Sequence, residues 1–238
     1  MYIFRVLFFS IFVLEASQLD YLIAPEIKDD TFYQMIYELA KTKNVKNILE
    51  IGSSSGEGST EAFVKGISEN PYHPLLFCME ISAVRFAALE AHYRNNPFVR
   101  CYRASSVPLS SFPTEEEVID FLETAPTILK GTQEVLRWLR QDIEYIKNSG
   151  VFQEGIALIK KQNSIEYFDM VLIDGSEFTG KPELDLVYGA KYILLDDIFC
   201  YKNLDNYEKL CCDPNYRLFA QDTYLRGGWA AFVKIEAE

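Results

Sequence analysis

Short apolar runs alternate with amphipathic segments along most of this 238-residue chain. The segments between the runs repeat apolar residues every three or four positions, which is typical of helices that bury one face. Regular alternation of strands with helices predicts an α/β fold, doubly wound and Rossmann-like, with a mostly parallel seven-stranded sheet. The expected parallel strands cover residues 48–51, 75–79, 98–102, 168–173 and 192–195.

The helices between these strands can also be placed. The stretch 29–31 (Asp-Asp-Thr) offers an N-cap for a first helix, in which Phe32, Ile36 and Leu39 recur at helical spacing. This helix precedes the first strand, and such helices either lie over a ligand or simply cover the sheet. Further helices are expected over residues 60–68, 83–94, 151–161 and 183–190.

The C-terminal part predicts an antiparallel hairpin. Two strand-like runs, 216–221 and 229–234, are joined by a turn that contains Gly227 and Gly228. Residues 108–160 are too many for one ordinary crossover, so we expect an insertion of two or three extra helices there. The predicted organisation is a lead-in over residues 1–29 and one domain over 30–238.

The stretch from Asn47 to Thr60 carries the clearest chemical signal, because an apolar run ends there in a turn rich in glycine and serine. Such strand–loop–helix units bind nucleotide-like ligands through backbone N–H groups and the helix N-terminus. The spacing is E-x-G-x-x-x-G-x-G, and Glu50 would repel a pyrophosphate but favour a cationic ligand. The alternative is a serine-rich helix cap. The residues expected to contact the ligand are Glu50, Gly52, Ser53, Ser54 and Gly56.

Acidic residues follow three of the other predicted strands. Glu80 follows the second strand, where a carboxylate can accept both ribose hydroxyls of an adenosyl group; the alternative is a solvent-facing acid. Asp174 follows the fourth strand, and Asp196 and Asp197 end the fifth. Because parallel strands end at one edge of a sheet, these acids could converge, and three converging carboxylates without a cation would raise their own pKa values.

Together, the loop Glu50–Gly56, the acid Glu80, the Ile173-Asp174-Gly175 motif and the terminal hairpin resemble class I S-adenosylmethionine (SAM)-dependent methyltransferases over residues 30–234. The nearest group is that of the small-molecule O-methyltransferases. The resemblance implies transfer of a methyl group from SAM, with oxygen of a small molecule or saccharide as the acceptor. It also implies that the insertion carries a substrate lid or a dimer contact.

The resemblance assigns roles to individual residues. Glu80 and Ile81 would hold the ribose side of SAM, Ser105 or Ser106 would lie near the adenine, and Asp174 would lie at the methyl end as the catalytic residue. In the metal-dependent members, Mg²⁺ would bind Asp174, Asp196 and Asp197. Alternatively, the Asp196–Asp197 pair caps a loop or binds substrate hydroxyls. The chain departs from the family in the turn 175–181, where Glu177 stands in place of a His or Lys base.

The charge and the cysteine content restrict the expected partners and the expected cellular compartment. The net charge of −12 argues against nucleic acid or an anionic membrane surface as a general partner, although a local basic patch stays open. The five cysteines show neither a disulfide pattern nor zinc-binding spacing, which favours a reducing cytoplasm.

Residues 1–14 are almost wholly apolar but too few to span a bilayer as a helix. They could form a packed N-terminal helix, a membrane-associating or secretory segment, or a translation start placed too early. Two other functions stay open for the whole chain. One is a non-catalytic binding protein with the same fold, and the other is an NAD-type oxidoreductase, which Glu80 allows but Glu50 disfavours.

Overall fold

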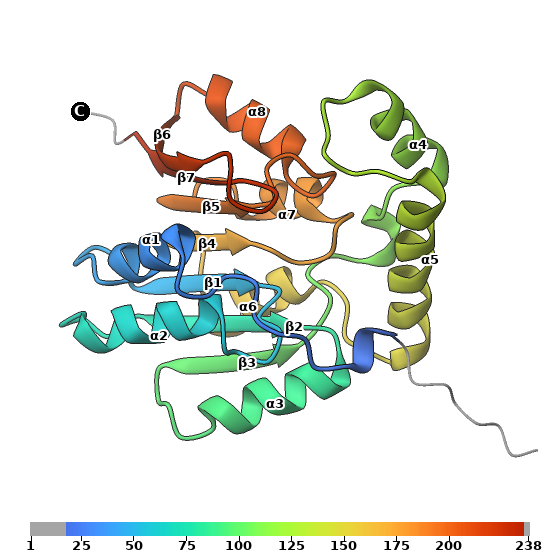
Figure 1. Cartoon of the computed structure of the whole chain (residues 1–238). Helices are drawn as coiled ribbons and strands as arrows, with labels where there is room; N and C mark the ends of the chain where they lie inside the picture. The colour runs from blue at the N-terminus through green and yellow to red at the C-terminus, as the bar shows by residue number, and fades with distance from the viewer. Residues whose placement is uncertain (1–17, 236–238) are drawn as a thin grey trace, which may run out of the picture.

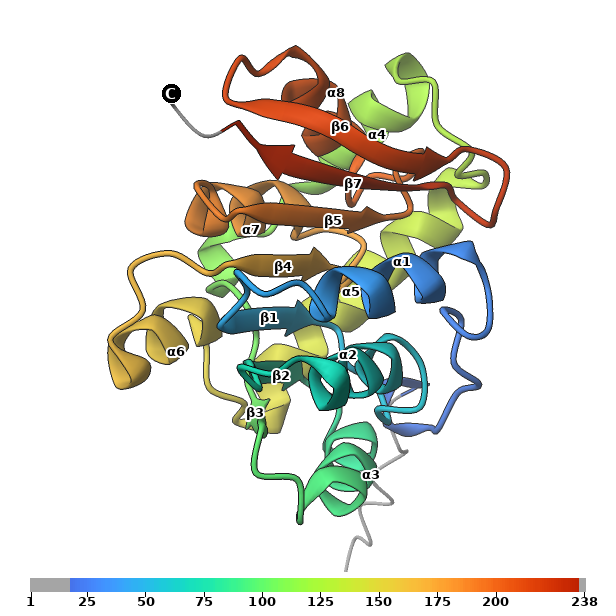
Figure 2. The same cartoon turned by 90° about the vertical axis from the view of Figure 1, so that its left-hand side faces the viewer.

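The centre of the molecule is one sheet of seven strands. In this computed structural model, which describes residues 18–235, the strand order is β3-β2-β1-β4-β5-β7-β6, and Figure 2 shows the strands stacked in that order. All neighbours pair in parallel except β7, which is antiparallel to both β5 and β6. The strands are β1 (Asn47–Ile51), β2 (Leu75–Glu80), β3 (Val99–Arg103), β4 (Met170–Ile173), β5 (Tyr192–Asp196), β6 (Tyr216–Asp222) and β7 (Trp229–Lys234).

Helices cover both faces of the sheet, because alternate residues of each buried strand point to opposite sides. On one face, Ile48 of β1 packs in a cluster with α1 (Thr31–Ala40), α2 (Ser59–Glu69) and α3 (Ala83–Tyr93). On the other face, Leu49 packs in a cluster with the second set of helices. That set comprises α6 (Gly155–Asn163), α7 (Gly180–Val187) and α8 (Leu204–Cys212).

The predicted insertion folds as a separate helical pair. Helices α4 (Glu115–Thr124) and α5 (Thr132–Ser149) share a small apolar cluster with Phe178 from the turn after β4. Figure 1 shows the pair standing to one side of the sheet, with the arrow of β4 pointing toward α5. The insertion therefore closes the carboxyl edge of the sheet, where parallel strands place their ligands.

The sequence predicted these elements with small errors at their ends. The Asp30 side chain caps α1 by accepting a hydrogen bond from the Tyr33 N–H at 2.8 Å, as expected. The hairpin β6–β7 is antiparallel and contains Gly227 and Gly228 in its turn, which confirms the predicted ending. The first predicted helix covers the sheet and stacks Phe32 on Trp229, with ring centroids 4.8 Å apart.

The N-terminal lead-in is part of the packed structure from residue 18 onward. It begins with the short helix η1 (Gln18–Asp20), and Ile27 belongs to the core cluster around α1 and α2. Residue 30 is therefore not a packing boundary. The alternatives for residues 1–14 lie outside the described part of the chain.

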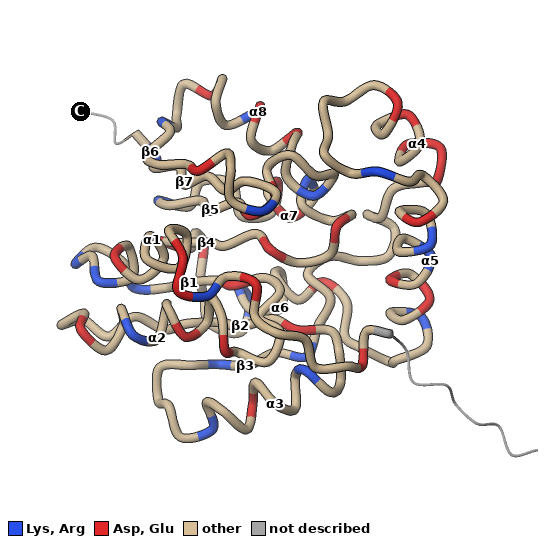
Figure 3. The backbone as a smooth tube through the Cα atoms, in the orientation of Figure 1, with Lys and Arg blue, Asp and Glu red and all other residues tan. Residues whose placement is uncertain are grey.

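Charges are distributed broadly over the surface. Figure 3 shows Lys and Arg positions on elements on both sides of the sheet and along α5, interspersed with the more numerous acids. Among residues 18–235, no helix is both long enough and apolar enough to cross a membrane.

Candidate functional site

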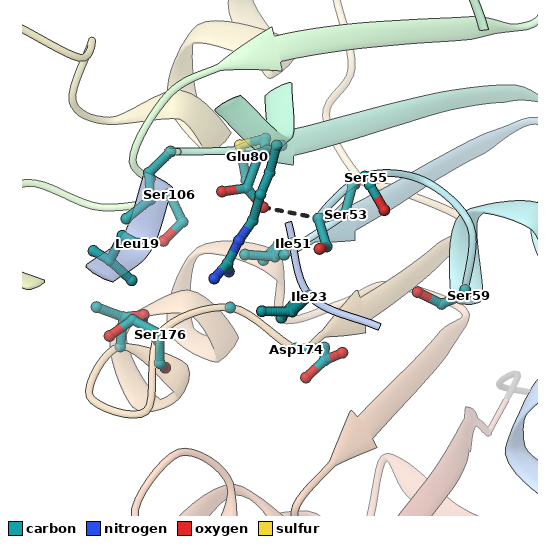
Figure 4. Close-up of a pocket in the computed structure, with 18 of the residues that line it drawn as sticks. Leu19, Ile23, Ile51, Ser53, Ser55, Ser59, Glu80, Ser106, Asp174 and Ser176 are labelled. Carbon is teal, nitrogen blue, oxygen red and sulfur yellow. Dashed lines mark hydrogen bonds between the residues drawn. The ribbon is translucent and has the colours of Figure 1, made fainter. Parts of the chain in front are cut away.

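One cavity lies at the carboxyl edge of the sheet, where β1, β2 and β4 end. Figure 4 shows Ser53, Glu80, Ser106 and Asp174 around it, and they come from the carboxyl ends of four different strands or from the loops that follow them. The insertion contributes Asp142 and Ile146 from α5, and the lead-in contributes Leu19 and Ile23. The sequence predicted a ligand site at this edge, because acidic residues follow several of the strands.

The glycine loop is held close against its neighbours by backbone hydrogen bonds. The N–H groups of Gly52 and Ser53 both donate to the Met79 carbonyl, at 3.1 and 2.9 Å. Gly52 has φ +91°, and a Cβ atom at this position would lie 1.9 Å from the Asp174 carbonyl oxygen. Only glycine fits here, because the first strand's loop must pass against the end of β4.

A hydrogen bond between Ser54 and Glu80 links the loop after β1 to the end of β2. The Ser54 N–H donates to Glu80 Oε2 at 2.9 Å, and the Ser82 N–H donates to Oε1 at 2.7 Å. A carboxylate offers about four acceptor positions, so about two remain for hydroxyl groups of a ligand. Burial raises the pKa of Glu80, and the backbone donors oppose that rise.

Ser54 also has an unpaired hydroxyl oxygen beside the cavity. Its Oγ is buried and has no hydrogen-bond partner among residues 18–235, and the residue belongs to the cavity lining. Buried hydroxyls are normally paired, so an unpaired one in a cavity wall indicates a place for a bound ligand. The loop and Glu80 thus fit the adenosyl donor that the sequence predicted.

Glu50 and Gly56 do not line the cavity, so the structure does not support their predicted direct contact with a ligand. The fully buried Glu50 accepts hydrogen bonds at Oε2 from Ser53 Oγ at 2.6 Å and Thr60 Oγ1 at 2.7 Å. Gly56 turns the loop against Tyr93, whose hydroxyl donates to the Gly56 carbonyl at 2.6 Å. Both residues therefore support the conformation of the loop without lining the cavity.

Ser105 and Ser106 line the cavity, but their hydroxyl protons are used within the protein. Ser105 Oγ donates to the Val107 carbonyl at 2.8 Å, and Ser106 Oγ donates to Glu183 Oε1. Either serine can still accept a hydrogen bond from a ligand through its oxygen. Ile81 also belongs to the lining, as predicted.

The three aspartates after β4 and β5 converge as the sequence indicated. One carboxylate oxygen from each of Asp174, Asp196 and Asp197 lies within 4.8 Å of the other two. However, the Lys202 ammonium lies among them, 2.7 Å from Asp174 Oδ1 and 2.9 Å from Asp197 Oδ2. These carboxylates therefore do not fit Mg²⁺ as they stand, because a protein cation already holds their oxygens.

Arg226 supplies a second cation to the same cluster. Its Nη2 lies 3.3 Å from Asp196 Oδ1, and its Nη1 binds Asp30 at the start of α1. Burial raises the pKa of Asp196 to about 6 despite the opposing charge of Lys202. The acids at this edge thus outnumber the cations that neutralise them.

Burial and neighbouring carboxylates shift the pKa values of the lining groups. Burial raises the pKa of Asp174 above its ordinary value; Lys202 opposes the shift, while Asp196 and Asp197 reinforce it. Burial alone would lower the pKa of Lys202, but the surrounding carboxylates, with Asp174 first, hold it well above the ordinary value. Lys202 is therefore a permanent cation near neutral pH.

The lead-in forms one wall of the cavity and is fixed by polar contacts. Asp20 Oδ1 accepts hydrogen bonds from Tyr145 Oη at 2.7 Å and from the Ala83 N–H at 3.1 Å. Arg85 Nε donates to the Tyr21 carbonyl at 2.9 Å. The segment thus connects the start of α3 to the insertion helix α5 across the cavity.

Sequence reasoning missed several polar residues of the lining, and four of them bear on its chemistry. Asp142 accepts a 2.5 Å hydrogen bond from Ser176 Oγ, and burial raises its pKa to about 6. The other two are Arg85 and Lys202. The only available signal was indirect: converging aspartates require a cation, and Lys202 is six residues beyond Asp196.

Comparison with known proteins was informative at the level of structure alone. No family model and no curated protein sequence matches the chain. A methyltransferase from Geobacter sulfurreducens aligns with a TM-score of 0.53 at 10% identity, over 89% of this chain and 81% of that chain. A structure described as "a putative caffeoyl-CoA O-methyltransferase from Staphylococcus aureus" aligns with a TM-score of 0.50 at 16% identity, over 87% and 85%.

A third similar structure is the cofactor-bound Rv0187 from MTB, with a TM-score of 0.50 at 16% identity, over 88% of this chain and 83% of that chain. At these identities the likeness concerns the fold. The strand order, the antiparallel β7 and the helices on both faces agree with it. The chain has the Rossmann-like fold of class I O-methyltransferases.

Proposed function

We propose that the chain transfers a methyl group from SAM to an oxygen atom of a small-molecule or saccharide acceptor. The observation that carries the proposal is the pairing of the loop Gly52–Ser54 with Glu80 at one cavity wall. Ser54 Oγ of this loop has no hydrogen-bond partner among the described residues, and Glu80 can accept more hydrogen bonds than the two it receives from the Ser54 and Ser82 N–H groups. The fold shared with known methyltransferases supports the same reaction.

The donor would lie with its ribose hydroxyls on Glu80 and its amino-acid part along Gly52 and Ser53. Ser105 and Ser106 would border the adenine on the far side of Glu80. When bound, SAM supplies a methyl group made electrophilic by a sulfonium. A cavity wall that carries Glu80 and Asp174 favours this positive charge and disfavours a pyrophosphate.

Asp174 would take the proton of the acceptor hydroxyl. Lys202 binds Oδ1 of Asp174, which leaves Oδ2 free of that contact in a residue that lines the cavity. As the new oxygen–methyl bond forms from an oxygen lone pair, the carbon–sulfur bond breaks and its electron pair stays on sulfur. The hydroxyl proton passes to Asp174, whose raised pKa makes it a better base near neutral pH.

The protein's main contribution would be alignment. The acceptor would lie between Asp174 and the wall formed by Ser176, Asp142 and Arg85. Polar groups on several sides suit an acceptor with several hydroxyls. Holding both reactants in line supplies much of the rate enhancement in transfers of this kind. A cytoplasmic location, where SAM is available, accompanies the proposal.

Melting temperature measured with added ligands tests the donor. We expect S-adenosylhomocysteine (SAH), the product form of the donor, to raise the melting temperature, and NAD⁺ to leave it unchanged. A shift with NAD⁺ alone would support an oxidoreductase instead. Binding of SAH without any SAH release from SAM over a broad panel of hydroxylated acceptors would support a non-catalytic binding protein.

A further inference from the structure

A lysine side chain occupies the centre of the carboxylate cluster at the ends of β4 and β5. Lys202 is 5% exposed, and its Nζ contacts Asp174 and Asp197 at 2.7 and 2.9 Å. The same cluster, with Asp196, has the ligand types and the spacing of a divalent metal site. The ammonium is therefore where an ion bound by these oxygens would be.

A divalent ion and the ammonium cannot share these oxygens. Mg²⁺ binds carboxylate oxygens at about 2.0–2.1 Å and keeps several water molecules around itself. An ion at that distance from Asp174 Oδ1 and Asp197 Oδ2 would overlap the space of Nζ. The two positive charges would also repel strongly in a buried site.

The backbone around Lys202 is held in place from three directions. The Lys202 N–H donates to Glu177 Oε1 at 3.1 Å. A Cβ atom at Gly180 would lie 1.8 Å from the Lys202 carbonyl oxygen, so α7 begins tightly against it. The next residue, Asn203, donates to the Ile173 and Asp196 carbonyls at 3.0 and 2.6 Å. The backbone that carries the lysine is therefore fixed, and its ammonium is held in the cluster by the two carboxylates.

The ammonium also has donor capacity to spare. It carries three N–H groups, and within residues 18–235 two of them have a carboxylate partner. Lys202 belongs to the lining of the cavity, as do Asp174 and Ser176. The third N–H is therefore available to a ligand that enters from the acceptor side.

We propose that the Lys202 ammonium replaces a divalent cation in this site, so that the chain binds neither Mg²⁺ nor Mn²⁺ there and holds the acceptor oxygen by a hydrogen bond from Nζ. The exclusion of metal depends only on the contacts of Lys202, whereas the role toward the acceptor rests on the proposed function.

This replacement changes the class of acceptor. A metal ion selects acceptors with two adjacent oxygens that chelate it. A single N–H donor requires one oxygen that accepts a hydrogen bond, such as an isolated hydroxyl. The bonds made and broken in the transfer are the same, and Asp174 still receives the proton.

The test is a metal titration of the full chain after removal of divalent ions with EDTA. Binding of MnCl₂ is followed by calorimetry and by the loss of the electron paramagnetic resonance signal of free Mn²⁺. We expect no binding by the wild-type protein. Lys202→Ala, which frees Asp174 Oδ1 and Asp197 Oδ2 from the ammonium, should bind about one Mn²⁺ per chain and should gain melting temperature when MnCl₂ is added.

Lys181→Ala is the matched control. Lys181 lies on α7 and pairs with Asp205 at 3.4 Å on the surface, so its removal frees no buried cluster and should confer no Mn²⁺ binding. Stoichiometric Mn²⁺ binding by the wild-type protein that Asp174→Asn abolishes would overturn the proposal. A folded Lys202→Ala protein that binds no Mn²⁺ would overturn it as well.

The Mn²⁺ titration of the wild-type protein tests the proposal even if Lys202→Ala does not fold. It is also separate from the proposed function, because the titration uses no SAM. A wild-type protein that binds SAH and Mn²⁺ would contradict the replacement alone. One that binds neither would contradict the methyltransferase proposal and leave the replacement intact.

Discussion

The buried Lys202 and the partly exposed Asp174 form an ion pair, with Nζ 2.7 Å from Oδ1, between the end of β4 and the loop after β5. The pair neutralises part of the carboxylate cluster that the strand ends create. It also fixes the acid that we propose as the proton acceptor. The fold therefore supplies from its own chain the cation that such a cluster requires.

Lys202→Met should destabilise the protein strongly. Removing one partner leaves the half-buried Asp174 and Asp197 without their counter-charge; the loss is about 3–5 kcal/mol for a fully buried pair and should be smaller here because water still reaches both carboxylates. Urea unfolding measures the change. The double variant Lys202→Met with Asp174→Asn should lose less than the sum of the single variants. A Lys202→Met protein as stable as the wild type would show that the pair is not formed.

Gly52→Ala should be far more damaging than alanine at another glycine with positive φ. At Gly52 a Cβ atom would lie 1.9 Å from the Asp174 carbonyl oxygen, whereas Gly150, at φ +62°, has nothing within 4 Å. The Gly150→Ala variant should show only the backbone cost of about 1–2 kcal/mol. Equal losses for the two variants in urea unfolding would contradict the close approach of the loop to β4.

Asp142→Asn should change the pH dependence of stability. Burial raises the pKa of Asp142 to about 6, against an opposing charge from Arg85 and a hydrogen bond from Ser176. The folded state therefore holds a proton that the unfolded state releases near pH 4, and wild-type stability falls as pH rises from about 4 to about 6.

The stability of the Asp142→Asn variant should not show this decrease between about pH 4 and about pH 6. It should be more stable than the wild type by up to about 3 kcal/mol above pH 6, and the advantage should vanish below about pH 4. Urea unfolding at several pH values measures both limits. Parallel stability curves for the two proteins would contradict the burial of Asp142 as an ionisable group.

The order of the elements was predictable because each strand is an uninterrupted apolar run with a polar end. Runs such as Ile193–Leu195 can only be buried on both sides, and the glycines of the first loop mark where the chain turns. Strand ends then determine which acids meet, so Asp174, Asp196 and Asp197 could be grouped without a structure.

The cation among these acids was not predictable by the same reasoning. Lys202 is in an irregular loop between β5 and α8, where no periodicity indicates a direction for the side chain. Glu50 was assigned a contact role because its position in the motif is adjacent to the loop. The structure turns it toward Ser53 and Thr60, since alternate residues of β1 face opposite sides.

The wall of the cavity formed by the lead-in and α5 depends on contacts distant in sequence. Asp20 meets Tyr145 across 125 residues, and no local pattern indicates that pairing. The insertion was expected from the length of the crossover alone. Its position at the carboxyl edge, which places Asp142 in the cavity, could be learned only from the packing.

The most direct test of the central claim is calorimetric titration of the purified chain with SAH. We expect micromolar binding, weakened roughly ten- to a hundred-fold by Glu80→Ala, because hydrogen bonds to a charged carboxylate contribute about 1.5–3 kcal/mol. Glu90→Ala, an exposed acid on α3, should bind as the wild type does. No binding of SAH by the wild-type protein would contradict the account and leave the fold without the proposed reaction.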